Sequence, residues 1–194
     1  IGQKVYPVHR LDRKTSGVLL FTKSSSMVSV FQEQWQTGEL QKQYIAIVRG
    51  HFPNYKDLNH PLLREDGKLQ DARTIFHCLE QIEIDWPNHR YQTSRYSLIQ
   101  AFLKTGRMHQ IRKHCNHLRH PIIGDRPHGC NKQNALFLEK MNLNKMLLHA
   151  HQMTFKHPIS KQYIELIAPL PEHFTFVMEA LRFKSRFSGW DSNE

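Results

Sequence analysis

The segment Val8–Arg13 combines one carboxylate with two arginines, directly before an apolar run. Asp12 lies two residues after Arg10 and next to Arg13. A loop at the edge of a strand commonly holds catalytic side chains, and a carboxylate held there can act as a nucleophile or stabilise positive charge. The same Arg-x-Asp-Arg pattern is also typical of a surface ion pair. The spacing leaves both interpretations open.

A second group of polar side chains follows a glycine turn between residues 104 and 114. Arg107, His109, Arg112 and Lys113 lie in or next to a segment whose apolar residues recur at helical spacing, which predicts a helix with a basic outer face. A helix N-terminus surrounded by arginines binds phosphate well, because its free N–H groups and the guanidinium groups attract anions. A solvated helix face would have the same composition.

The histidines near this segment raise the question of a metal site. Zinc sites need convergent Cys or His ligands in tight pairs, or an HExxH pair on one helix. The cluster near this segment has neither pattern, so we predict no metal site. Its members are His109, His114, Cys115, His117 and His120. The chain also lacks a GxxxxGK[ST] loop, a GxGxxG after a strand and a GxSxG elbow, which disfavours nucleotide hydrolysis and simple esterase chemistry.

The composition indicates a folded protein with an acidic polymer as its partner. In 194 residues, 27 Lys and Arg oppose 17 Asp and Glu, so the formal net charge is +10. Hydrophobic residues make up 39% and charged residues 23%, which is the balance of a globular domain and not of a disordered basic tail. No apolar run is long enough to span a bilayer. The three cysteines form no CxxC pair and no signal peptide pattern is present, so we expect a cytoplasmic protein.

Hydrophobic periodicity predicts the elements that must position these side chains. We expect strands at Gly17–Thr22, Tyr44–Val48, Arg73–Ile84, Tyr91–Leu103, Leu147–Phe155 and Tyr163–Ile167, and helices at Met27–Thr37, Met108–Leu118 and Pro171–Phe183. Ser26 is the expected N-cap of the first helix, and Trp86–His89 the turn between the two long strands. Strands and helices do not alternate regularly, which favours an α+β fold with a mixed, mainly antiparallel sheet and flanking helices. No linker or repeat divides residues 1–194, so we expect a single domain.

Taken together, three strings resemble the RluA-type pseudouridine synthase family. They are His9–Gly17 (HRLDRKTSG), Lys42–Tyr44 followed by Val48–Gly50 (KQY and VRG), and Thr105–Arg112 (TGRMHQIR). Further similarities favour the branch that modifies uridine 65 at the foot of the T stem of tRNA; they are Ile1–Tyr6, His120–Asp125, His128, Gly129, Asn134 and Leu148–Ala150. The family usually begins with a strand and an NKPSG-like segment before HRLD, so we expect this chain to lack that segment. Cys130 follows Gly129 where the family has Asp.

The resemblance implies the pseudouridine synthase catalytic fold and a role for each matching residue. Asp12 would be the catalytic aspartate, Tyr44 the active-site tyrosine and Arg112 the basic partner of the aspartate. Arg10 would fill the gap that a flipped base leaves in the RNA stack, a task suited to a planar guanidinium. The RNA-binding residues would be Arg10, Arg13, Arg107, His109, Lys113 and Arg119. The isomerisation is redox-neutral, so we expect no cofactor, and we expect a monomer that binds RNA and no membrane.

Other interpretations stay open from the sequence. The target could be ribosomal RNA, since family members modify it with the same catalytic residues. A non-catalytic RNA-binding module would need no Asp12, and a metal-dependent hydrolase would need zinc. Whether Asp12 attacks the ribose or the base, or assists deprotonation of C2′, is not encoded in the spacing.

Overall fold

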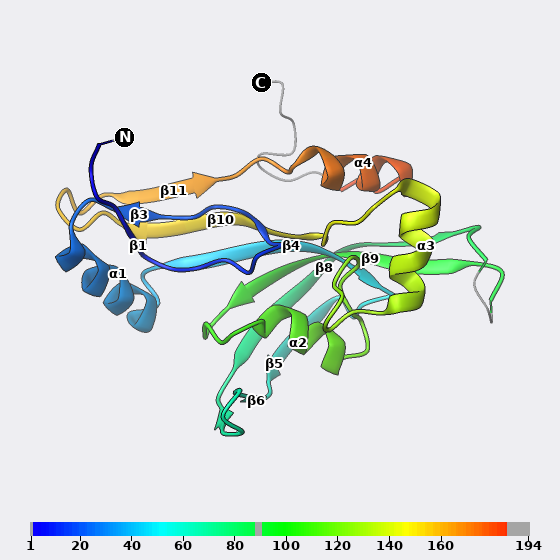
Figure 1. Cartoon of the computed structure of the whole chain (residues 1–194), viewed down its shortest axis with the longest axis horizontal. Helices are drawn as coiled ribbons and strands as arrows, with labels where there is room; N and C mark the ends of the chain where they lie inside the picture. Colours follow the sequence, from blue (N-terminus) through cyan, green and yellow to red (C-terminus); the bar gives the residue numbers. More distant parts are fainter. Residues whose placement is uncertain (1, 88–90, 186–194) are drawn as a thin grey trace.

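The computed structural model describes residues 2–87 and 91–185, and a seven-stranded sheet forms its centre (Figure 1). The strand order is β11-β10-β4-β9-β8-β5, with β2 pairing on β10. All neighbours are antiparallel except β2 and β10, which are parallel. The bounds are β2 Ser16–Gly17, β4 Gln41–Arg49, β5 Tyr55–Asn59, β8 Arg73–Ile84, β9 Ser94–Leu103, β10 Leu148–Lys156 and β11 Tyr163–Ile167. The expected α+β fold with a mainly antiparallel sheet is confirmed.

Helices cover both faces of this sheet, because the central strands carry apolar side chains on both sides that must be buried. The helices are α1 Ser25–Thr37, α2 Gln110–His117, α3 Asn131–Met141 and α4 Glu172–Ala180. Ile45 and Ile47 of β4 pack in one core with residues of α3 and α4, whereas Tyr44, Ala46 and Val48 pack in another core with residues of α2. This alternation follows from the two-residue period of a strand. In Figure 1, α1 and α2 lie below the sheet and α4 lies above it.

The expected helices form with small shifts at their ends. The first helix begins two residues early, at Ser25, with Ser24 in place of Ser26 as its N-cap, and Gly38 ends it in the left-handed conformation (φ 83°). The second begins at Gln110 and ends at His117, and the last ends at Ala180. The sequence did not predict α3, because a polar residue occupies its inner face: Gln133 is buried there and accepts a hydrogen bond from the Tyr96 hydroxyl at 2.6 Å.

The expected strands of the main sheet also form. The hairpin of β8 and β9 is confirmed, although β9 begins at Ser94 and not at Tyr91. Part of its expected turn, residues 88–89, lies outside the described residues. A small hairpin of β6 (Leu62–Leu63) and β7 (Leu69–Gln70) extends beyond β5 and was not predicted.

The prediction of one buried strand at Gly17–Thr22 is wrong. The run contains the end of β2 and the two-residue strand β3 (Phe21–Thr22), which pairs with β1 (Tyr6–Pro7). The side chains of Leu19 and Phe21 are 41% and 48% exposed. The run divides because Gly17, at φ 115°, turns the backbone away after docking on β10. The two pairings together frame the loop that carries Asp12.

This loop is anchored where it meets the sheet. The Ser16 hydroxyl lies 2.8 Å from Nδ1 of His149 on β10, and the Val18 amide donates to the carbonyl of Ala150 at 2.8 Å. A Cβ at Gly17 would lie 2.1 Å from the Ala150 carbonyl oxygen. Only glycine therefore lets β2 approach β10 this closely.

Across the described residues, no helix is both long and apolar enough to cross a membrane.

We expect Gly17→Ala to lower the free energy of unfolding more than Gly38→Ala does. Both glycines have positive φ, which costs an alanine about 1–2 kcal/mol, but a Cβ at Gly38 meets nothing within 4 Å. Gly17→Ala adds a backbone clash to that cost. Urea denaturation of the two variants measures the difference, and equal losses would show that the close approach to β10 is unimportant.

Candidate active site

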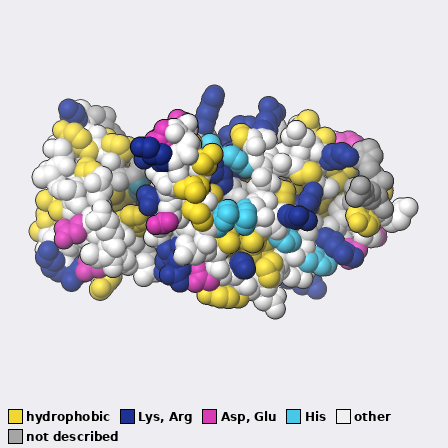
Figure 2. Space-filling view, turned by 90° about the horizontal axis from the view of Figure 1, so that it is seen from below, with side chains coloured by type: hydrophobic (Ala, Val, Ile, Leu, Met, Phe, Trp, Pro, Cys, Tyr) yellow, Lys and Arg dark blue, Asp and Glu magenta, His cyan; other side chains and the backbone are white. Residues whose placement is uncertain are grey.

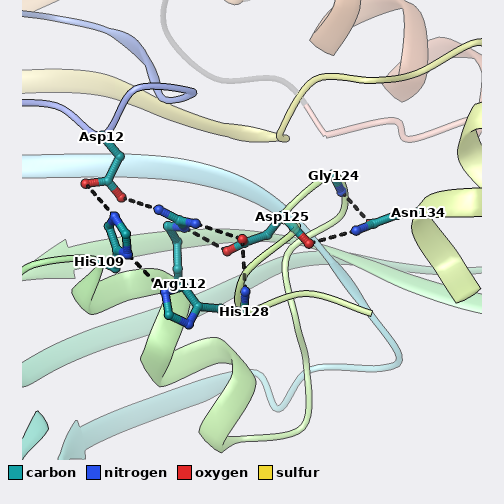
Figure 3. A network of polar contacts seen from close by, with 7 residues as sticks. All are labelled: Asp12, His109, Arg112, Gly124, Asp125, His128 and Asn134. Carbon is teal, nitrogen blue, oxygen red and sulfur yellow. Dashed lines mark hydrogen bonds and ion pairs between the residues drawn. The ribbon is translucent and has the colours of Figure 1, made fainter. Parts of the chain in front are cut away.

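The three residues expected to be catalytic come together from distant parts of the chain. Asp12 lies in the loop between β1 and β2, Tyr44 in β4 and Arg112 in α2. Nη1 of Arg112 donates to Oδ2 of Asp12 at 3.0 Å (Figure 3). The Asp12 side chain is 22% exposed and Arg112 only 8%. A buried guanidinium therefore holds a partly accessible carboxylate.

Arg112 is itself held by a second carboxylate, Asp125. Nε of Arg112 donates to Oδ2 of Asp125 at 2.7 Å, and Nη2 donates to Oδ1 at 2.8 Å. This is the fork geometry in which arginine binds carboxylates most strongly. Burial alone would lower the pKa of Arg112, but the hydrogen bonds to Asp125 and Asp12 outweigh it, so the pKa is raised and the charge is permanent.

The loop between α2 and α3 and the first turn of α3 fix Asp125 in turn. The His128 amide donates to Oδ1 of Asp125 at 3.2 Å, and Nδ2 of Asn134 donates to its backbone carbonyl at 2.7 Å. The Gly124 amide donates to Oδ1 of Asn134 at 2.9 Å. Sequence analysis noted Asp125, His128 and Asn134 as similarities but gave them no role. A carboxylate two residues after the apolar segment Pro121–Ile123 is the signal that could have identified a buried partner.

Tyr44 lies beside this network with its ring in the α2-side core. Its side chain is buried, and burial together with the nearby charge of Asp12 raises the pKa of the phenol well above its usual value. The hydroxyl therefore keeps its proton at neutral pH.

Asp12, Tyr44 and Arg112 line a cleft of about 440 Å³. Such a volume is typical of small-ligand sites, which span roughly 300–1,000 Å³. Strand β4, helix α1, the Asp12 loop and the N-terminal part of α2 contribute its walls; the remaining lining residues are Val8, His9, Arg10, Leu11, Thr15, Phe31, Gln32, Trp35, Leu40, Lys42, Leu103, Gly106, Arg107, Met108, His109, Gln110, Ile111 and Leu148.

One end of the cleft is aromatic and cationic. Nζ of Lys42 lies 4.3 Å from the ring centroid of Trp35. Burial lowers the pKa of Lys42 to about 8. The pKa of His9 falls to about 4, through burial first and the charge of Lys42 second, and the neutral ring accepts a hydrogen bond from the Leu20 amide at 3.2 Å. Sequence analysis quoted His9 and Lys42 within motifs but assigned neither to the site.

The six residues expected to bind RNA divide into two groups. Three of them line the cleft: Arg10, Arg107 and His109. The other three lie outside the lining: Arg13, Lys113 and Arg119. Arg13 and Arg119 are exposed, and Nζ of Lys113 donates to the Leu63 carbonyl at 3.1 Å. Figure 2 views the molecule from below Figure 1 and shows Lys, Arg and His side chains across that face.

The expectation that the outer face of α2 is densely basic is wrong for Arg112 and His114. Both are buried, and His114 is fully enclosed. Its Nδ1 lies 2.9 Å from the Thr74 hydroxyl and its Nε2 lies 3.0 Å from the His60 carbonyl. Helical spacing cannot distinguish a cation that faces water from one that pairs with a buried carboxylate.

Comparison with known proteins shows the family of this chain. The family model described as RNA pseudouridylate synthase matches residues 2–117. The chain belongs to this family and is therefore an isomerase that acts on uridine in RNA. It is 37% identical to the tRNA pseudouridine synthase C of Haemophilus influenzae, covering 99% of this chain and 82% of that protein. It is 40% identical to the tRNA pseudouridine synthase C of Vibrio cholerae, covering 89% and 75%.

Solved structures show the same fold at lower sequence identity. Human RNA pseudouridylate synthase domain containing 4 superposes with a TM-score of 0.71 at 23% identity, covering 92% of this chain and 76% of that chain. Human RNA pseudouridylate synthase domain containing 1 gives a TM-score of 0.67 at 21% identity, covering 93% and 81%.

We expect Arg112→Lys to lower the free energy of unfolding by about 3–5 kcal/mol, because one ammonium cannot bridge both carboxylates and Asp125 stays buried. Arg73→Lys is the matched control. Arg73 makes the same two-bonded contact to Asp57, at 3.0 and 2.6 Å, but on the surface, where the loss should stay below about 1 kcal/mol. Urea denaturation measures both, and equal small losses would show that the buried pair adds no stability.

We expect RNA affinity of the wild type to fall by roughly threefold to tenfold between pH 7 and pH 9, because Lys42 loses its proton as the pH passes its pKa of about 8 and one attraction to phosphate is lost. Lys42→Met should bind weakly at both pH values. Lys42→Arg should bind tightly at both, since arginine keeps its charge. Filter binding at constant salt measures the dissociation constants, and the same pH dependence in all three proteins would contradict a role for Lys42.

Proposed function

We propose that this protein converts uridine 65 in the T stem of tRNA to pseudouridine, with Asp12 as the catalytic carboxylate. The tRNA substrate is supported by relatives named tRNA pseudouridine synthase C at 37–40% identity over most of the chain. The position follows from the resemblance of His120–Asp125 and Leu148–Ala150 to that branch. Ribosomal RNA, which related enzymes modify, is the alternative target.

The observation that carries the proposal is the Asp12 carboxylate, held by Arg112 inside the cleft beside Tyr44. The reaction breaks the bond from N1 of uracil to C1′ of the ribose, rotates the base and joins C5 to C1′. Arg112 holds Asp12 in place by a hydrogen bond and aims it at the sugar, where a carboxylate can attack or stabilise positive charge. The Tyr44 ring can stack on the uracil and keep it in the cleft while it is detached.

Base flipping follows from the shape of the site. A uridine within a stem is paired and stacked, so its glycosidic bond reaches Asp12 only after the nucleotide leaves the helix. Arg10 is exposed at the rim of the cleft and can occupy the vacated position in the stack. Arg107, Arg13, Lys113 and Arg119 then contact phosphates of the surrounding stem, and His109 contacts the flipped nucleotide. We further infer one catalytic domain that acts as a monomer in the cytoplasm.

The direct test maps pseudouridine at single-nucleotide resolution after incubating the purified protein with total tRNA and with ribosomal RNA fragments. The expected product is pseudouridine at position 65 of tRNA. Modification of ribosomal RNA alone would overturn the tRNA assignment and leave the reaction standing. The absence of pseudouridine from both pools would refute the proposed function.

We expect Asp12→Asn to abolish pseudouridine formation while RNA affinity stays within about tenfold of the wild type, because phosphate contacts elsewhere supply most of the affinity. The amide keeps the size of the side chain but cannot act as a carboxylate. Single-turnover assays and filter binding measure the two effects separately. Substantial turnover by this variant would exclude Asp12 as the catalytic group.

A further inference from the structure

The cleft wall next to Asp12 carries His109, which contacts His128 outside the lining, and the steps above leave both histidines without chemistry. Nδ1 of His109 lies 2.9 Å from Nε2 of His128, and the two rings meet edge to face. Nε2 of His109 lies 3.9 Å from Oδ1 of Asp12. The pair thus connects the catalytic carboxylate to the loop before α3 (Figure 3).

We propose that His109, supported by His128, takes the proton from C5 of the uracil and returns a proton to N1. This inference rests on the proposed isomerisation. When C5 has bonded to C1′, it still carries its hydrogen and the ring holds an N1=C6 double bond. Nε2 of His109 removes that hydrogen as a proton, the C5–H electron pair forms the C5=C6 bond, and the N1=C6 pair moves onto N1. N1 then takes a proton from His109, which ends as it began.

Four other titratable groups that line the cleft are poorly suited to this step. Tyr44 keeps its proton, because burial and Asp12 raise the pKa of its phenol. All three donor nitrogens of Arg112 are engaged by carboxylates. Lys42 is mostly charged at neutral pH and lies against Trp35. Nε2 of His9 is occupied by the Leu20 amide.

The hydrogen-bond geometry of His109 suits a proton carrier. When Nδ1 of His109 donates to Nε2 of His128, Nε2 of His109 keeps a free lone pair on the side of Asp12. Burial lowers the pKa of His128, so that ring stays neutral and can accept. After His109 takes the proton, its positive charge lies beside the Asp12 carboxylate, which stabilises it. His128 is in turn fixed through its amide, which donates to Asp125 at 3.2 Å.

The backbone also holds His109 in an unfavourable conformation. It precedes α2 with φ 56° and ψ 27°, in the left-handed region that non-glycine residues seldom adopt. Such strain is maintained where the surrounding structure requires one side-chain direction. Asparagine and glycine tolerate this region best, so they are the substitutions that change the imidazole with least disturbance of the backbone.

The test compares single-turnover rates on a tRNA transcript that carries either ordinary uridine or uridine with deuterium at C5. The wild type should show an isotope ratio near one, because proton removal is fast. His109→Asn should be slower by about a hundredfold to ten-thousandfold, the usual contribution of a general base, and its isotope ratio should rise well above one. Added imidazole should restore part of the rate of His109→Gly. His128→Asn should slow the same step less, also with an increased isotope ratio.

His157→Asn is the matched control. His157 lies outside the cleft lining and accepts a hydrogen bond from the Ser160 amide, and asparagine can accept the same bond. Both the rate and the isotope ratio of this variant should stay at wild-type values.

Two results would overturn the proposal. If His109→Asn is slow but shows no isotope effect, His109 is merely structural; if His109→Asn reacts at the wild-type rate, it is not needed for the reaction. If the wild type forms no pseudouridine, both the proposed function and the role of His109 are refuted. If the wild type is active and His109→Asn shows no isotope effect, only the role of His109 as proton carrier is refuted.

Discussion

The position of Asp12 depends on one guanidinium that spans two carboxylates. Arg112 donates once to Asp12 and twice to Asp125, and its buried charge is stable only because both partners are present. The network of Asp125, His128 and Asn134 therefore acts through Arg112 on Asp12, the residue proposed as catalytic. Asp12 lies on a loop, but its position is fixed as precisely as that of a residue on a rigid element. The reason is that its partner Arg112 belongs to helix α2 and is itself held by Asp125.

The sheet supplies the rigidity that this arrangement needs. Strand β4 lies between β10 and β9 and places Tyr44 on the face covered by α2, so the tyrosine and Arg112 approach from opposite sides of one core. The Asp12 loop joins them because β2 docks on β10 through Gly17 and through Ser16, which contacts His149. The loop is thus tied to the same strand pair that carries Tyr44.

Burial also shifts the pKa of three side chains in the cleft. It keeps Tyr44 protonated, brings the pKa of Lys42 to about 8 and that of His9 to about 4. Arg112 stays charged although it is buried, because its hydrogen bonds to Asp125 and Asp12 raise its pKa. In the proposed reaction, an anionic nucleotide meets cations at the rim and at the aromatic end, and the Asp12 carboxylate where the glycosidic bond must break.

The sequence alone determined the α+β class and most elements of the sheet, and its motifs predicted the residues proposed as catalytic, Asp12, Tyr44 and Arg112, because hydrophobic period and short motifs are local properties of the chain. It did not reveal α3, whose inner face carries the polar Gln133, and it misjudged Gly17–Thr22, whose apolar run bends at a left-handed glycine. Only the tertiary structure decided that Asp125 holds Arg112, that His114 is buried and that His109 faces both Asp12 and His128. These contacts join separate segments, and the free energy of a buried charge or hydrogen bond depends on which partner the fold brings to it, a property that no spacing along the chain contains.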